Sequence, residues 1–191
     1  MTNKLLKPVT YVATGILTLI FMALDYFQAI VTFGKEKQSE GQDAFEFIKL
    51  DVEGADSEVL KTIASVALVG IIIAAVIVLL AGIVKLLPVF GVKVDALDSR
   101  AALIDKVASI ILKAMVALNV VALVCTLLFG LGNTEEVWGA KIIMTTDIGA
   151  YFLLVLAIVA VIVEKIANKK AAAEVVAEEA PVQEETTTEE N

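Results

Sequence analysis

The chain has no histidine and only one cysteine, and these two shortages exclude several kinds of site. Cys125 lies inside an apolar run and has no second cysteine with which to form a disulfide in the same chain. Zinc sites of the usual kind need histidine or several cysteines, so the sequence excludes them too. Walker A, Rossmann and nucleophile-elbow glycine patterns are also missing, so we expect neither a cofactor nor enzymatic activity.

Basic residues are outnumbered by acidic ones. The sequence has 15 Lys and Arg against 23 Asp and Glu, which gives a formal net charge of −8. Nucleic-acid binding requires clustered Lys and Arg, so the composition excludes it.

Apolar residues are abundant. They make up 59% of the sequence, and the mean hydropathy is +0.86, whereas ordinary soluble domains are roughly 45–50% apolar. Four apolar runs are each long enough to cross about 30 Å of hydrocarbon with about 20 helical residues. These runs cover approximately residues 9–33, 59–87, 107–131 and 142–163. We therefore predict an all-α, polytopic integral membrane protein with a bundle of four transmembrane helices in residues 1–168.

The distribution of Lys and Arg predicts the orientation, because cytoplasmic segments carry an excess of both. Nine of them lie at the ends of the runs or in the segments on one side: Lys4, Lys7, Lys85, Lys93, Arg100, Lys106, Lys165, Lys169 and Lys170. Five lie on the other side, together with ten acids: Lys35, Lys37, Lys49, Lys61 and Lys141. We expect a multi-pass protein of the cell membrane with both termini in the cytoplasm.

Two segments lie outside the predicted spans. In the first outer loop, alternating apolar side chains at Ile48, Leu50 and Val52 favour a short strand. Residues 169–191 are rich in Ala, Glu and Thr and carry too little apolar mass to pack, which predicts a disordered acidic cytoplasmic tail, with a short helical extension over 171–180 as an alternative.

The first apolar run carries a regular polar pattern. Its members are spaced alternately three and four residues apart, which places all of them on one face of a helix: Tyr11, Thr14, Thr18, Phe21, Asp25, Gln28 and Thr32. Polar groups that face lipid go unsatisfied, so this face turns toward other helices or toward water. It forms either a hydrogen-bonded packing face or a solvated path.

Asp25 is the most informative single residue of this pattern. A carboxyl group inside the membrane is a candidate proton or cation site, and its alternative role is that of a neutral hydrogen bonder. Asp147 is predicted at a similar depth and either joins Asp25 in such a site or caps a helix. The candidate ion, proton or interhelical polar site comprises Asp25, Gln28, Thr18, Asn119 and Asp147.

The second run contains a face of small residues. Alanines and glycines recur within one sector of the helix, which favours close approach of a neighbouring backbone: Ala64, Ala67, Gly70, Ala74, Ala75, Ala81 and Gly82.

The layout of four spans with both termini inside resembles that of claudin-type proteins in outline. The paired cysteines and the tryptophan motif of their first outer loop are absent from 34–61, so the resemblance assigns no family and no function. We expect a non-catalytic scaffold, assembly factor or accessory subunit, and the alternative is a small oligomeric channel or transporter for ions or protons. The expected partners are the lipid bilayer and other membrane-protein helices, including further copies of the chain.

Overall fold

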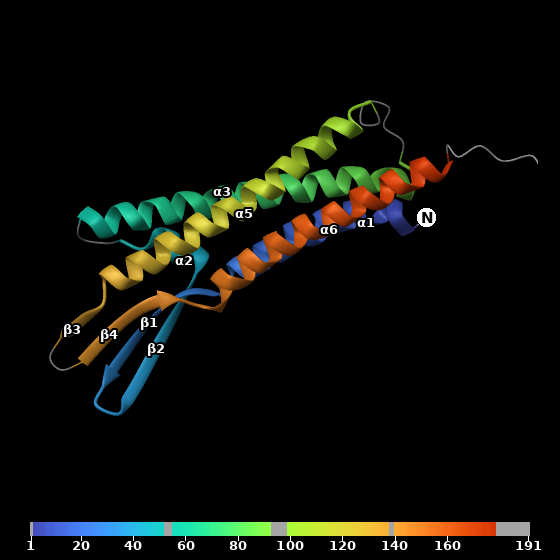
Figure 1. The fold of residues 1–191 in the computed structure, drawn as a ribbon. Helices are drawn as coiled ribbons and strands as arrows, with labels where there is room; N and C mark the ends of the chain where they lie inside the picture. Colours follow the sequence, from blue (N-terminus) through green and yellow to red (C-terminus); the bar gives the residue numbers. More distant parts are fainter. Residues whose placement is uncertain (1, 52–54, 93–98, 138–139, 179–191) are drawn as a thin grey trace, which may run out of the picture.

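Four long helices and a small sheet make up the computed structural model, which describes residues 2–51, 55–92, 99–137 and 140–178. The helices are α1 (Thr2–Met22), α3 (Ala55–Leu86), α5 (Ala101–Gly132) and α6 (Ile148–Glu178). Each contains a segment long and apolar enough to cross a membrane. Each of the four packs against two of the others: α1 and α5 both contact α3 and α6 (Figure 1).

The predicted first and fourth helices are wrong at their outer ends. Residues 25–33 form strand β1 (Asp25–Phe33), and residues 140–146 form strand β4 (Ala140–Thr146). Helix α1 therefore ends 11 residues before the predicted position of 33, and α6 starts six residues after the predicted 142. Strand β1 is rich in aromatic and β-branched residues, which fit a pleated, half-buried surface.

The sheet is antiparallel, with the strand order β2-β1-β4-β3. Strand β2 (Glu36–Asp43) follows β1 through a two-residue turn, in which Gly34 has φ of +59°. Only glycine adopts that conformation without strain, so Gly34 permits the tight hairpin. Strand β3 (Glu135–Val137) is short and pairs with β4.

The strand expected around Ile48 and Leu50 is not formed. Instead, Ala44–Lys49 forms the short helix α2. Its capping box explains the choice, because the Asp43 carboxylate accepts the backbone N–H of Glu46 and the Glu46 carboxylate accepts that of Asp43. Val52 lies outside the described residues.

The small-residue face of α3 packs as predicted. Ala64, Ala67, Ala74 and Ala75 are all buried. A Cβ atom added to Gly82 would lie 2.9 Å from the Pro8 carbonyl oxygen, and one added to Gly15 would lie 2.8 Å from that of Ala75. Glycine is therefore required at both positions for α1 and α3 to approach this closely.

Helix α3 ends at Leu86, close to the predicted end of the second run at 87, because proline cannot continue the helical hydrogen bonds. Pro88 lies in a 3-10 turn, Leu87–Phe90, and Gly91 follows with φ of +81°. Helix α6 continues to Glu178, so the first ten residues of the segment predicted as a tail, 169–178, are helical, and 179–191 lie outside the described residues.

The molecule has two distinct ends. We call the end where α1 begins and α6 ends the terminal end, and the opposite end, which carries the sheet, the sheet end (Figure 1).

Candidate functional site

The polar stripe predicted along one helix is divided between two structures. Tyr11, Thr14 and Thr18 are buried on α1 inside the bundle. Asp25, Gln28 and Thr32 lie on β1, beyond the end of the helix at Met22. The predicted helical face therefore does not extend past α1.

Asp25 and Asp147 lie at the corner where the sheet meets the helices. The Asp147 N–H donates to the Tyr26 carbonyl oxygen at 2.8 Å, which fixes the two chain segments side by side. Asp147 Oδ1 accepts the first N–H of α6, that of Ile148, at 2.6 Å. Asp147 thus occupies the helix-capping position that the sequence left open as an alternative.

The Asp25 carboxyl group points at another strand. It is exposed, and it lies over Gly41 of β2 so closely that an added Cβ there would be 2.5 Å from Asp25 Cγ. Gln28 is half-buried and pairs with Gly41 and Thr145 in the sheet. Among the described residues, no group of three Asp, Glu, His or Cys side chains could hold a metal ion.

The other two predicted residues are buried in the bundle. Thr18 is 1% exposed and Asn119 is 4% exposed. The Asn119 amide nitrogen donates to the Met115 carbonyl oxygen of its own helix at 2.8 Å. The structure therefore gathers Asp25, Gln28 and Asp147 at the sheet end and leaves Thr18 and Asn119 inside the bundle, so the five residues form no single site.

The sequence analysis missed Glu164, which is the most buried acid among the side chains that the structure describes. Glu164 on α6 is only 2% exposed. Its Oε1 accepts the Tyr11 hydroxyl of α1 at 2.9 Å, and its Oε2 accepts the Ser109 hydroxyl of α5 at 3.2 Å. A buried carboxyl group needs such partners, because its desolvation is otherwise uncompensated.

An ion-pair triad lies nearer the terminal end. The Asp105 carboxylate of α5 pairs with Lys7 of α1 at 3.4 Å and also with Lys85 of α3. Together with Glu164, Tyr11 and Ser109, these three residues form what we call the terminal cluster, to which all four long helices contribute. The cluster fixes the helices relative to one another.

The sequence carried partial signals for the terminal cluster. Tyr11 began the polar stripe, but Glu164 and Asp105 lay just outside the predicted spans, which ended at 163 and began at 107. Extending those spans by a single helical turn would have brought both acids into the bundle.

Aromatic packing attaches the sheet to the helices. Phe27 of β1, Phe47 of α2 and Phe129 of α5 contact one another with ring centroids 5.2–5.9 Å apart. Tyr26 packs on Phe47 at 5.7 Å, and its hydroxyl group lies 3.2 Å from that of Thr126. All four rings are buried, so the sheet is held rigidly on the end of the bundle.

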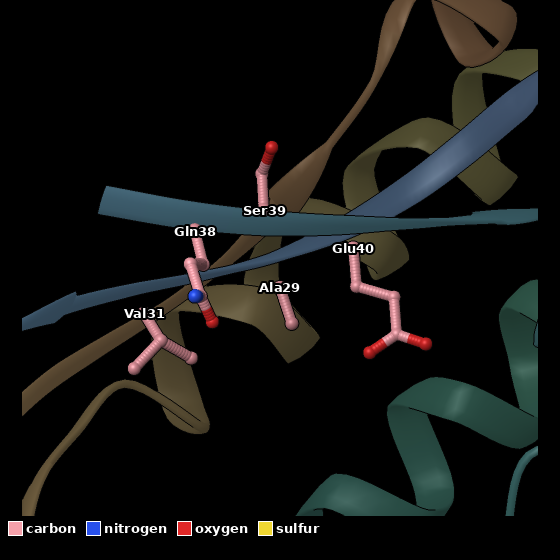
Figure 2. A pocket seen from close by; sticks show the side chains of 5 residues that line it. All are labelled: Ala29, Val31, Gln38, Ser39 and Glu40. Carbon is pink, nitrogen blue, oxygen red and sulfur yellow. The ribbon is translucent and has the colours of Figure 1, made fainter. Parts of the chain in front are cut away.

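A groove lies on the sheet where β1 and β2 pair. It consists of two hollows of about 440 and 90 Å³, which share Ala29 and Glu40 in their linings. Figure 2 shows the side chains of Ala29, Val31, Gln38 and Glu40 on one side of the strands and that of Ser39 on the other. We call these two hollows the sheet groove.

The chain matches no protein-family model and none of the curated proteins with which it was compared.

Proposed function

We propose that the chain is an integral membrane protein of the cell membrane, with the terminal end in the cytoplasm and the sheet outside. The large apolar side chains that point away from the bundle support membrane insertion, because lipid would cover them; they include Ile16, Ile20, Ile73, Leu80, Val155 and Ile162. The charge distribution supports the orientation, since the sequence carries nine Lys and Arg in the segments that we expect to be cytoplasmic. Asp25 and Asp147 join the ten acids already assigned to the outer side, so twelve acids accompany five lysines there.

We further propose that this protein works by association, as a non-catalytic scaffold, assembly factor or accessory subunit that binds partners through its sheet end. One observation carries this proposal. Asp25, Gln28 and Thr32, the outer part of the predicted polar stripe, lie on β1 in a four-stranded sheet that is held rigidly outside the bundle. A rigid, exposed sheet is a surface suited to a partner and has no use in conducting an ion.

Photocrosslinking in intact cells tests this role. A photoreactive residue at Lys37 or Ser39, both exposed on β2, should give a discrete adduct with a second protein. The control position is Leu80, which is exposed on α3 and should contact lipid. Association through the sheet would be contradicted if neither Lys37 nor Ser39 gave a discrete protein adduct in higher yield than Leu80 does.

Transport of protons or ions remains the second candidate, and buried Glu164 is the observation in its favour. Thr14, Thr18 and Asn119 are also buried in the bundle, which gives polar groups at several depths. Purified protein in liposomes should show no flux of protons or of monovalent or divalent cations if association is the function. Flux that Glu164→Gln abolishes would instead establish transport.

A further inference from the structure

The sheet groove combines an apolar floor with unpaired hydrogen-bond acceptors. Its lining includes Phe27, Ala29, Val31, Leu50 and Met144. Two amides and one carboxylate join them, from Gln38, Gln42 and Glu40 of β2. No basic side chain lines either hollow.

Two of the acceptors lack partners in the described part of the chain. Gln42 Oε1 is buried and accepts no hydrogen bond from any described residue. The Glu40 carboxylate forms neither an ion pair nor a hydrogen bond within the same residues. Gln42 Oε1 is the buried atom of the two, and a buried acceptor without a donor costs free energy, so a ligand that donates to it would be stabilised. Glu40 is exposed to solvent, and its carboxylate attracts such a ligand through its negative charge.

The spacing of these acceptors fits one long basic side chain. Glu40 and Gln42 are two residues apart on β2, so they point to the same side with Cα atoms roughly 6.6 Å apart. A lysine ammonium or an arginine guanidinium has several donors and can bond both acceptors at once. The aliphatic part of such a side chain would lie on the apolar floor.

The partner is an extended segment, because the groove runs beside an open edge. Strand β2 is an outer strand of the sheet and pairs only with β1 among the described strands. An extended segment added along β2 would bond its free backbone groups and place alternate side chains over the groove. A second copy of β2 suits this edge poorly, because the strand has three acids and one lysine, and two copies would repel each other.

We propose that the sheet groove binds an extended segment of another protein, with a Lys or Arg side chain between Glu40 and Gln42 and a neighbouring aliphatic side chain over Ala29 and Val31. This inference rests on the association role proposed above and names the chemistry of the partner. The acidic excess of the sheet end favours the approach of such a basic segment.

Peptide binding to the full chain tests the proposal. The protein is placed in nanodiscs of uncharged phosphatidylcholine, and binding of a fluorescent nonapeptide of alternating valine and lysine is measured by anisotropy. Peptides with glutamate or norleucine in place of lysine are the ligand controls. The lysine peptide should bind, and each control peptide should bind roughly tenfold more weakly or not at all.

Variants of the groove then separate specific recognition from general charge attraction. Glu40→Gln and Gln42→Met should each weaken binding of the lysine peptide, Glu40→Gln by roughly tenfold. Ala29→Phe should block the groove without changing the charge. The matched control is Glu36→Gln, which removes a charge from the same face of the same strand outside the groove lining, and it should change Kd less than twofold. Thermal unfolding of each variant verifies the fold.

Several results would overturn the proposal. If Glu36→Gln and Glu40→Gln weakened binding of the lysine peptide equally, the binding would be a general electrostatic attraction to the acidic sheet end. If all three peptides bound equally well, the groove would not recognise a basic side chain. Glu40-dependent dimerisation without peptide binding would identify a second copy as the occupant. If the peptide does not bind but the photocrosslinked adducts at Lys37 and Ser39 persist, the groove proposal is wrong and the association role stands. If those adducts are lost as well, the association role is contradicted.

Discussion

At the scale of single residues, the Glu164 side chain links three helices of the bundle, α1, α5 and α6. Its two oxygen atoms accept hydroxyl groups from two other helices, at 2.9 and 3.2 Å, in surroundings that exclude water. Removal of the carboxyl group would leave both Tyr11 and Ser109 without their buried acceptor.

Glu164→Ala should therefore destabilise the protein, by about 1–3 kcal/mol for each hydroxyl group left unpaired. Glu164→Gln keeps the length of the side chain and one acceptor, so this variant should lose clearly less stability than Glu164→Ala. Thermal unfolding in detergent compares the two variants with Lys165→Ala, an exposed neighbour that should be near neutral. Equal losses for Ala and Gln would show that the hydrogen bonds contribute little.

A second prediction concerns the contact between Asp25 and Gly41. A methyl group at Gly41 would lie within 2.8 Å of three atoms of the Asp25 carboxyl group. Gly41→Ala should cost at most about 1 kcal/mol of stability, because the exposed Asp25 carboxyl group must rotate away from the added methyl group. Ser39→Ala, on the same strand and face, is the control and should change little. The double variant Asp25→Ala/Gly41→Ala should recover stability relative to Gly41→Ala, and additive losses would argue against this contact.

At the scale of elements, residues 25–33 show why the sequence was misinterpreted. The polar spacing of three and four residues continued through Asp25, Gln28 and Thr32, which suggested that the first helix did too. The same segment alternates Phe27, Ala29, Val31 and Phe33 every second residue, and a turn follows at Gly34. Both periods fit a short apolar run, and only the pairing with β2 and β4 decides between them.

Other elements were predictable because their signals are local. The number of long helices, the end of α3 near Pro88 and the close packing of its small-residue face follow from runs of side chains that are near one another in sequence. The terminal cluster joins Tyr11 to Glu164 across 153 positions, and no local pattern specifies that contact. The sheet groove likewise depends on the register of β1 against β2, which the sequence did not predict.

The attachment of the sheet gives a test at this scale. Phe47 is fully buried between Tyr26, Phe27 and Phe129. Phe47→Ala should cost about 3–5 kcal/mol and make the sheet a substrate for limited proteolysis, while α3 and α5 stay protected. Phe33→Ala is a matched control, since Phe33 is 63% exposed at the hairpin tip, and it should leave both properties unchanged. Intact sheet strands in Phe47→Ala after protease treatment would contradict this account.

The same junction predicts a response to alkaline pH. Burial raises the pKa of Tyr26 from 10.0 to about 12, although the hydrogen bond with Thr126 acts in the opposite direction. The folded state thus holds this proton more tightly than the unfolded state, so the contribution of Tyr26 is full below pH 10 and is lost as the pH rises through 12. The loss is about 3 kcal/mol at most.

Tyr26→Phe provides the control for that response, because it keeps the ring and removes the titrating group. Unfolding midpoints measured in detergent between pH 9 and 12 should fall more steeply for the wild type than for Tyr26→Phe. Identical slopes would assign the alkaline loss to other groups, such as the lysines.

At the scale of the whole molecule, the two ends differ in chemistry as well as in structure. The terminal end has the ion-pair triad of Lys7, Lys85 and Asp105 and most of the basic residues. Among the described residues, the sheet end has an excess of acids, an exposed edge strand and the sheet groove. This difference between a basic end and a shaped, acidic end agrees with the proposal that the sheet end binds a partner.

This arrangement makes a prediction about sidedness that can be tested residue by residue. In a background with Cys125→Ala, single cysteines at Lys37 and Thr134 should react with a membrane-impermeant maleimide in intact cells, because both positions lie at the exposed sheet end. Cysteines at Arg100 and Lys170 should react only after permeabilisation, because the proposed orientation places the terminal end in the cytoplasm. A cysteine at Leu80, where lipid covers the side chain, should stay unreactive in both conditions. The reverse pattern at all four exposed positions would invert the orientation and place the sheet groove before a cytoplasmic partner, whereas a mixed pattern would mean that the four helices do not all cross the membrane.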